Sequence, residues 1–566
     1  MMKKMILSTI MVVAVAVAVM AVPAKKGLTK TIKLVDGTEV QAELVGDEHG
    51  HYWKTADGKA FMERNDGDFV AIDAQQVISH AKARRSKLHQ RHKAMRRVSM
   101  GDRTHYTGNK KGLVILMNYK DLKFQSANNL AKYRNILNKA GYNEGNFKGS
   151  VADYFKAQSG GDFVLTFDVV GPFTAQENMS YYGANNAQGD DQHPEQLIVE
   201  AVTAANSSVN FKDYDWDNDG EVDQVFIVYA GKGEADGGAS NTIWPHMWAL
   251  AETDNVQTLD GVKINTYACA NELSGSSISG IGCFCHEFSH CLGYPDFYDT
   301  SYSGWYGMGD WDLMCGGSYN GNAFRPAGYT SYEKWMAGWL EPVVLDKDMK
   351  VDNLKPISNG GGAYVLYNSG HADEYYLIEN RRKVNWDSAL PGKGLMITHV
   401  DFDKNIWQEN TPNTRVTAKD VENYAAQGYT VHENDHQRCT IFRAGSSTGS
   451  SSAANDLYPY KKMLTVKNSL TATSQPAATL YNENAEGNKK MEKGITEITQ
   501  NADGTMSFIF GEPQEEEEEG DVTGIKTVTT KAANAAIYTL EGRYVGADID
   551  ALPRGLYIVN GRKVVK

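Results

Sequence analysis

The pattern of apolar and polar positions changes period along the chain. Between residues 25 and about 80, segments such as TIKLVDGTEVQAEL alternate apolar and polar residues around an Asp-Gly pair, which indicates β-hairpins. From residue 111, buried strands such as GLVILMNY and QVFIVYAG alternate with amphipathic helices such as NLAKYRNILNKA. We therefore expect a β-rich unit with a basic linker over residues 25–105, followed by an α+β domain over residues 106–345.

The second half of the chain has the period of short strands. Segments such as AYVLYN, YYLIENRR and TMSFIFG are separated by turns rich in Gly, Asn and Ser, which predicts a β-rich, sandwich-like domain over residues 346–512. The acidic run of residues 513–523 repels itself and is expected to form an extended linker. Residues 524–566 return to apolar and polar alternation and predict a small C-terminal β module.

The first 24 residues are typical of a targeting segment. A basic start, Met1-Met2-Lys3-Lys4, precedes the apolar run MILSTIMVVAVAVAVMAV and then small residues. This predicts a secretory signal peptide cut near Ala21 or Ala24. An uncleaved anchor helix is the alternative, because the run is just long enough to span a bilayer. No other apolar run approaches that length, so we expect an exported chain, either secreted or held at the cell surface.

Charge and cysteine content narrow the function classes. The chain of 566 residues has a formal net charge of -13 at pH 7, which argues against nucleic acid and against anionic membranes as partners. Six cysteines allow 15 disulfide connectivities, and none has the CxxC spacing of a thiolate metal site. We expect small buried residues or local disulfides; the positions are Cys269, Cys283, Cys285, Cys291, Cys315 and Cys439.

The segment CFCHEFSHCLGYPDFYD, residues 283–299, carries the strongest chemical motif. Residues four apart lie on one helix face, so His286 and His290 would project together as two ligands of one metal ion. With Glu287 they form HExxH, in which zinc lowers the pKa of its water to about 7. Glu287 would then be the general base for attack of that water on a carbonyl. The alternative is a core helix with two hydrogen-bonded histidines.

A third ligand is expected where this helix breaks. Gly293 tolerates the left-handed conformation that ends a helix and reverses the chain, and Pro295 stiffens the backbone after the reversal. The reversal can return Asp296 to the metal. A site of the thermolysin type would instead take a carboxylate from a later segment, for which the sequence offers Asp310, Asp312 and Glu333.

The string HExxHxxGxxD resembles the metzincin signature, with aspartate where many members have histidine. Metzincins also have a methionine turn beneath the metal, and Met314 in GDWDLMCGGSYNG fits that role. An ordinary core methionine is the alternative. The resemblance implies a metzincin-like α+β catalytic domain.

More of the chain resembles the immune inhibitor A family of secreted bacterial metallopeptidases. The resemblance rests on KGLVILMNYKD, VADYFKAQSGG, DWDNDGEVDQVFIVYAGKG, IWPHMW, HEFSHCLGYPDFYD and WDLMCGGSYNG, in that order. It covers residues 110–345 most fully and extends more loosely to 512. It implies a zinc endopeptidase that acts on proteins outside the cell, with His286 and His290 as ligands and Glu287 as base.

Two further segments predict binding sites. Residues 213–223, DYDWDNDGEVD, place carboxylates at Asp215, Asp217, Asp219 and Asp223 around Gly220, which is the spacing of the first half of an EF-hand calcium loop. The alternative is an acidic turn that caps the next strand, because the closing glutamate of an EF-hand is absent. His399 and Asp401 point to one side of a strand, where a hydrogen-bonded pair is favoured over a second metal site.

The C-terminal module resembles the sorting domain of type IX secretion in IYTLEGRYV, LPRGLYIVNG and KVVK. The resemblance implies transport across an outer membrane with the secretion machinery as partner. A β module that merely packs on its neighbour is the alternative.

These features together predict a secreted, zinc-dependent endopeptidase with protein or peptide substrates, made as a zymogen. The N-terminal unit would be its propeptide, removed after Arg84-Arg85 or Arg96-Arg97 in the basic linker. It contains no cysteine, so a cysteine cannot block the zinc; an aspartate or simple occlusion remains. Two rivals stay open: an exported surface-binding protein or adhesin with a structural or inactive metal site, and a zinc hydrolase of glycopeptide or peptidoglycan amides.

Overall fold

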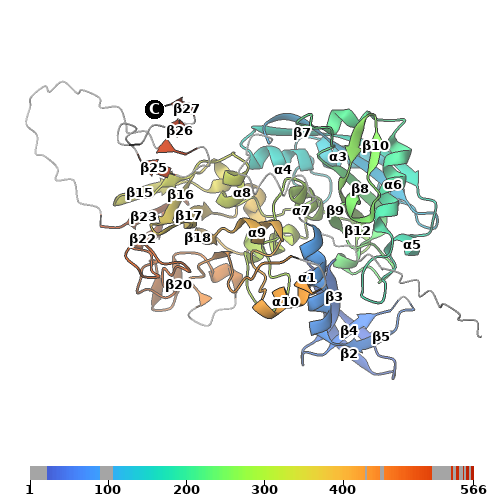
Figure 1. The fold of residues 1–566 in the computed structure, drawn as a ribbon, viewed down its shortest axis with the longest axis horizontal. Coiled ribbons are helices and arrows are strands. Elements are labelled where there is room, and N and C mark those ends of the chain that lie inside the picture. The colour runs from blue at the N-terminus through green and yellow to red at the C-terminus, as the bar shows by residue number, and fades with distance from the viewer. Residues whose placement is uncertain are drawn as a thin grey trace, which may run out of the picture.

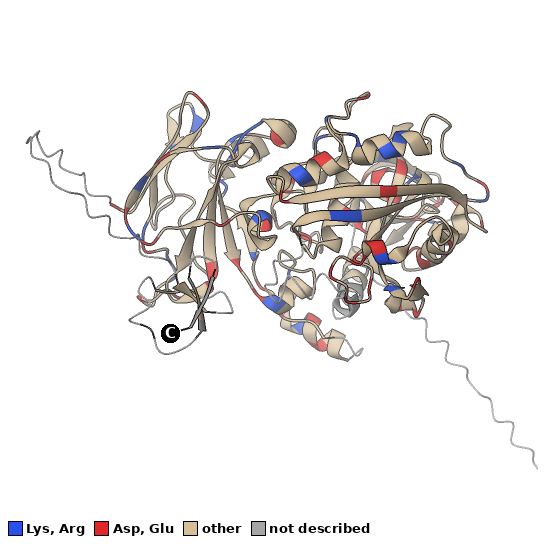
Figure 2. Cartoon of the chain, turned by 90° about the horizontal axis from the view of Figure 1, so that it is seen from above, with Lys and Arg blue, Asp and Glu red and all other residues tan. Residues whose placement is uncertain are grey.

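The computed structural model describes residues 22–64, 66–88, 106–426, 430–446 and 452–512, together with short segments between 537 and 565. Helices and strands are mixed along the chain, as the sequence predicts. Most of the expected signal peptide, most of the basic linker and the acidic linker lie outside the described residues. Charged residues of both signs are interspersed along the described chain (Figure 2).

The first described element is an antiparallel sheet with its strands in sequence order, drawn in blue in Figure 1. Helix α1 (Ala74–Leu88) follows it and packs on its third strand. The tip between the second and third strands is unusual, because Asp47, Glu48 and His49 there are buried although polar. The strands are β1 (Thr29–Lys33), β2 (Glu39–Asp47), β3 (Gly50–Thr55), β4 (Ala60–Glu63) and β5 (Phe69–Ile72).

A central, mostly parallel sheet lies next, in the order β13-β12-β8-β6-β7 with β9 paired to β12. One of its inner strands is β6 (Gly108–Asn118), whose run LVILMN is buried on both faces, which explains why the apolar residues there do not alternate. The other strands are β7 (Phe163–Thr174), β8 (Val225–Lys232), β9 (His246–Ala249), β12 (Thr266–Ser274) and β13 (Ser277–Ile278), with a separate hairpin of β10 (Gln257–Leu259) and β11 (Val262–Ile264).

Helices cover the central sheet and begin where the sequence supplies caps. Ser150 and Asp153 form a capping box at the start of α4, and Pro194 opens α6. Among the described residues, no helix has the length and the apolar character that crossing a bilayer requires. The helices of this region are α3 (Leu130–Asn138), α4 (Val151–Gln158), α5 (Met179–Gly183), α6 (Pro194–Ala205), α7 (Gly282–Cys291) and α8 (Ser331–Met336).

The following region is rich in strands. One sheet has the order β14-β16-β17-β18-β19 and a smaller one the order β15-β23-β22, and residues of both contribute to one hydrophobic cluster. The strands are β14 (Val343–Val344), β15 (Met349–Leu354), β16 (Ala363–Asn368), β17 (His371–Arg381), β18 (Gly394–Asp401), β19 (Cys439–Ile441), β20 (Tyr460–Lys462), β21 (Thr465–Lys467), β22 (Ile495–Gln500) and β23 (Met506–Phe510).

Two insertions and the C-terminal end complete the fold. Helices α9 (Lys404–Gln408) and α10 (Ala418–Ala425) lie between β18 and β19, and Figure 1 shows them between the strand-rich region and the central sheet. The C-terminal strands form a further sheet in the order β25-β24-β26-β27. Their bounds are β24 (Ile537–Tyr538), β25 (Tyr544–Gly546), β26 (Leu556–Val559) and β27 (Arg562–Val565).

Candidate metal centre

Helix α7 holds the HExxH motif in the interior of the protein. Every residue of the helix except Cys283 is buried. Phe284 stacks on Phe226 of the central sheet with ring centroids 3.8 Å apart, and Phe288 packs on Phe155. Because these two aromatic residues fasten one face of the helix to the core, the other face presents His286 and His290 together, as the sequence predicts.

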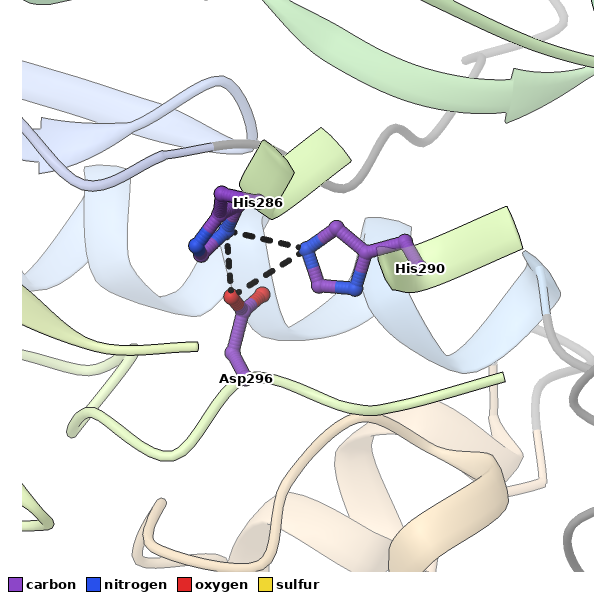
Figure 3. A group of neighbouring side chains, drawn as sticks. All are labelled: His286, His290 and Asp296. Atoms are coloured by element: carbon purple, nitrogen blue, oxygen red, sulfur yellow. Dashed lines mark hydrogen bonds and ion pairs between the residues drawn. The ribbon is translucent and has the colours of Figure 1, made fainter. Parts of the chain in front are cut away.

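Three side-chain atoms converge on one point (Figure 3). The Nε2 atoms of His286 and His290 are 3.0 Å apart, and Oδ1 of Asp296 lies 3.2 Å from the first and 3.4 Å from the second. Two atoms that each lie about 2.0 Å from one tetrahedral ion are about 3.3 Å apart. The spacing of the three atoms therefore fits a single zinc-sized ion.

The hydrogen bonds of His286 and His290 and the ionisation of Asp296 also favour a cation at the shared point. Nδ1 of His286 lies 2.8 Å from the carbonyl of Leu313, and Nδ1 of His290 lies 2.7 Å from the carbonyl of Tyr294. Each carbonyl accepts a hydrogen bond from Nδ1–H, which leaves Nε2 with its lone pair toward the shared point. Burial lowers the pKa of His286. Although burial opposes it, the neighbouring histidines hold the pKa of Asp296 well below its usual range, so its carboxylate is ionised.

The helix break delivers Asp296 as expected. Helix α7 ends at Cys291, and Gly293 lies just beyond it with a φ of 98°, a backbone conformation that favours glycine. The reversed chain places the Tyr294 carbonyl on His290 and carries Asp296 beneath both histidines. Asp296 is also bound by Asn410, a residue 114 positions later that the sequence pattern did not single out.

Met314 lies in a turn below the metal ligands and is fully buried. Its carbonyl accepts a hydrogen bond of 2.8 Å from the N–H of Phe297, next to Asp296. The preceding residue, Leu313, supplies the carbonyl that orients His286. The turn thus contacts His286 and the residue after Asp296 through its backbone.

Glu287 is fully buried and its carboxylate is already engaged. Its Oε1 accepts a hydrogen bond of 2.7 Å from the backbone N–H of Val22, and its Oε2 has no hydrogen-bond partner among the described residues. Burial raises the pKa of Glu287 well above its usual range, the Val22 N–H lowers it, and the charge of Asp296 raises it further. This contact with the N-terminal segment was not foreseen from the sequence.

Residues 22–25, which we call the N-terminal strap, contact α7 through the hydrogen bond from Val22 to Glu287. Trp244 donates to the Val22 carbonyl at 3.0 Å, and the Tyr319 hydroxyl donates to the Pro23 carbonyl at 2.8 Å. Lys25 donates its backbone N–H to the Ala235 carbonyl and pairs its ammonium with Asp236 at 3.1 Å.

At the tip of the first sheet, Asp47 accepts a hydrogen bond of 3.2 Å from Tyr298. The strap and this tip together cover the site.

Other carboxylates near the site, Asp299 on the same loop and Glu333 of the alternative ligand set, are engaged in other contacts. Asp299 accepts hydrogen bonds from Ser301, Ser303, Gly304 and Trp305, which hold the loop after the site. Glu333 forms the capping box of α8 with Thr330, and the side chains of Glu333 and Asp312 are both fully buried. Burial raises the pKa of both carboxyl groups.

Glu333→Gln should match the wild type in stability at pH 5 and become relatively more stable as the pH rises. Burial, and then the charge of Asp312, raise the pKa of Glu333 well above its usual range. The stability contributed by its proton is full below the unfolded pKa near 4.5 and is lost as the pH rises through the raised folded pKa. Glutamine cannot lose that proton. Denaturant unfolding of both proteins from pH 5 to pH 9 measures the difference.

Two controls sharpen the Glu333 experiment. Glu333→Ala leaves the N–H and the hydroxyl of Thr330 without the carboxylate that accepts from them and should cost about 2–4 kcal/mol at every pH. Zinc content should be unchanged in Glu333→Gln, because the residue is no ligand. Parallel pH profiles for Glu333→Gln and the wild type would show that Glu333 is ionised in the fold.

The acidic loop of residues 213–223 brings three of its four predicted residues together. Carboxylate oxygens of Asp215, Asp217 and Asp223 lie within 4.8 Å of one another. Asp219 is not one of this group; its carboxylate accepts the Glu221 N–H at 2.9 Å. Gly220 has a φ of 89° at the sharp turn, as the sequence predicts. The loop thus has the shape of a small cation site built from three carboxylates.

His399 and Asp401, which the sequence places on one side of a strand, each form ion pairs with other residues. His399 pairs with Glu374 at 2.7 Å, whereas Asp401 pairs with Arg438 at 2.7 Å and with His436 at 2.8 Å. The six cysteines all lie in the described residues, and all are free thiols. All but Cys283 are buried, so of the two expected alternatives, small buried residues and local disulfides, the structure shows the first.

Comparison with known proteins agrees with this geometry. Residues 103–343 match the family model described as immune inhibitor A peptidase M6, catalytic domain. The pre-pro-metalloprotease PrtV of Vibrio cholerae serotype O1 is 28% identical over 217 residues, which cover 33% of this chain and 23% of PrtV. Immune inhibitor A of Bacillus thuringiensis subsp. alesti is 27% identical over 290 residues, 42% of this chain and 41% of that protein. The chain therefore spans less than half the length of each relative, and the matches support a metallopeptidase segment.

Proposed function

We propose that this protein is a zinc-dependent endopeptidase that hydrolyses protein substrates, with residues 103–343 as its catalytic segment. His286, His290 and Asp296 would hold the ion and Glu287 would act as the general base. The observation that carries the proposal is the convergence of three ligand atoms beside a buried glutamate on the same helix. A purely structural zinc site has no need of that glutamate, which favours an enzyme over an adhesin.

A bound zinc ion would act as a Lewis acid on the peptide carbonyl and would lower the pKa of water at the site to about 7. Glu287 takes a proton from the attacking water at its carboxylate and passes it to the leaving amine. The carbonyls of Leu313 and Tyr294 hold the Nδ1–H protons, so both histidines keep their Nε2 lone pairs for binding.

The direct test of this function uses the processed protein and casein. Cleavage should stop when a chelator removes the metal and should return when zinc is added. Cleavage that is indifferent to the chelator would exclude a metallopeptidase. Parallel assays on a peptidoglycan fragment would separate a peptidase from the amidase that the motif alone permits.

The N-terminal unit is proposed as a propeptide that keeps the enzyme latent. The strap supports this role, because Val22 binds the oxygen of Glu287 that the reaction requires. A signal cut after Ala21 leaves the strap in place, whereas a cut after Ala24 removes most of it. The Vibrio relative is described as a pre-pro-metalloprotease, and the same organisation is proposed here.

The protein is also proposed to be exported from the cell. The sequence pattern of residues 1–24 supports a secretory signal peptide, and the resemblance of the C-terminal strands to a sorting domain supports passage through an outer-membrane secretion machinery. The enzyme would then be released or held at the cell surface. Detection of the protein and of casein cleavage in medium or on intact cells, with and without residues 524–566, tests both parts.

Calcium is proposed as a structural ion in the loop of residues 213–223. When the free calcium concentration is about 100 times the Kd of the site, one bound ion stabilises a protein by about 2.7 kcal/mol. This raises the melting temperature by roughly 5–10 °C. Replacing Asp215 and Asp217 by asparagine should remove this gain and should lower the melting temperature only when calcium is present. Melting curves with calcium and with chelator measure it.

Asp219→Asn is the matched control for the calcium experiment. It removes a neighbouring carboxylate that caps Glu221 but lies outside the group of three. The calcium-dependent gain should persist in this variant. Equal melting curves of the wild type with and without calcium would remove the ion from the proposal.

A further inference from the structure

Asn410 makes two hydrogen bonds to the third metal ligand. Its Nδ2 donates to Oδ2 of Asp296 at 2.7 Å, and its Oδ1 accepts the backbone N–H of Asp296 at 2.5 Å. Both residues are fully buried. The two oxygens of the Asp296 carboxylate therefore have different partners. Oδ2 accepts the hydrogen bond from Asn410, and Oδ1 faces the two histidines.

The local sequence explains how Asn410 reaches this position. Asp403 caps the start of helix α9, and Trp407 on that helix packs against Phe297 beside the metal ligand. Asn410 lies just past the end of the helix with a φ of 53°, where asparagine is, after glycine, the favoured residue. The short helix thus stops at a residue whose carboxamide is aimed back at Asp296.

The rest of the loop is built to hold this contact. Asn413 donates to the Phe297 carbonyl at 2.9 Å, and the Thr414 hydroxyl accepts the Thr300 N–H at 3.1 Å. Asn434 braces the loop from behind by donating to the carbonyls of Thr411, Pro412 and Thr414. Residues 410–414 therefore lie along residues 296–300, with the ligand at one end of the contact.

We infer that Asn410 is a positioning residue for the metal centre: it fixes the Asp296 carboxylate so that Oδ1 alone faces the ion. The inference rests on the proposed zinc site and goes beyond it, because Asn410 comes from the strand-rich region. Partners that orient metal ligands commonly contribute about 10–100-fold to metal affinity. The match to the peptidase family model ends at residue 343, well before Asn410, so the segment it covers lacks part of its own metal centre.

Asn410→Gly in the full-length chain tests this role. Glycine keeps the positive φ without strain, so the variant removes the carboxamide and little else. The zinc Kd, measured by competition with a chelator of known affinity, should rise about 10–100-fold. The visible absorption of the Co²⁺-substituted protein should also change, because an untethered carboxylate alters the ligand geometry. Asn410→Asp, which sets a carboxylate against Asp296, should weaken zinc at least as much.

Thr414→Val is the matched control, because it removes a contact of the same loop that does not touch a ligand. Its zinc Kd should stay within about twofold of the wild type, and the metal-free forms of both variants should melt at similar temperatures. Wild-type affinity in Asn410→Gly, or an equal loss in Thr414→Val, would overturn the inference while leaving the zinc site intact. A wild-type chain that binds no zinc would instead overturn the proposed function, and the inference with it.

Discussion

Glu287→Ala is expected to abolish cleavage of casein by the processed protein and to leave its zinc content unchanged. The change removes the proposed base but none of the proposed ligands, which are His286, His290 and Asp296. General acid–base catalysis of this kind contributes about 10²–10⁴-fold to the rate. Steady-state cleavage of casein, together with metal analysis of the same samples, measures both quantities.

Asp296→Ala provides the opposite control. It removes a ligand and leaves the base, so both zinc content and activity should fall. Full zinc occupancy in Asp296→Ala would show that the third ligand lies elsewhere, although Asp299 and Glu333 are committed to other contacts. Undiminished proteolysis by Glu287→Ala would exclude the proposed mechanism.

The convergence of His286, His290 and Asp296 was predictable from the sequence because its signals are local. The four-residue spacing in α7 results from helix geometry alone, and the break at Gly293 results from the conformational freedom of glycine. Both signals lie within eleven residues of one another, from His286 to Asp296. A pattern of this kind needs no knowledge of how distant segments meet.

The contacts that complete and cover the site were not accessible in this way. Val22 and Asn410 reach Glu287 and Asp296 across 265 and 114 positions, and neither belongs to a motif with a defined spacing. An asparagine after a short helix is a common helix end, so its carboxamide carries no signal of its target. In the loop of residues 213–223 the sequence spacing predicted four converging carboxylates. It could not show that Asp219 lies outside the group that the other three form.

Removal of the N-terminal unit is expected to raise casein cleavage by about two to three orders of magnitude. The strap places Val22 on Glu287, and a tethered segment has an effective concentration of about 1 mM, so even micromolar intrinsic affinity leaves about one cleft in a thousand open. Limited trypsin should release a fragment ending between about Arg84 and Arg103, in the basic linker. Activity measured against time, with gel analysis of the same aliquots, should show both changes together.

Glu287→Ala is the matched control for activation. It should release the same fragment under trypsin and gain no activity, which separates processing from catalysis.

N-terminal sequencing of the latent and the active forms shows where each begins. A latent form that begins at Val22 retains the strap, whereas one that begins at Lys25 must depend on the tip at Asp47 and on the first sheet. A fully active species that still begins at either residue would show that residues 25–100 are a permanent domain, and latency by occlusion would be wrong.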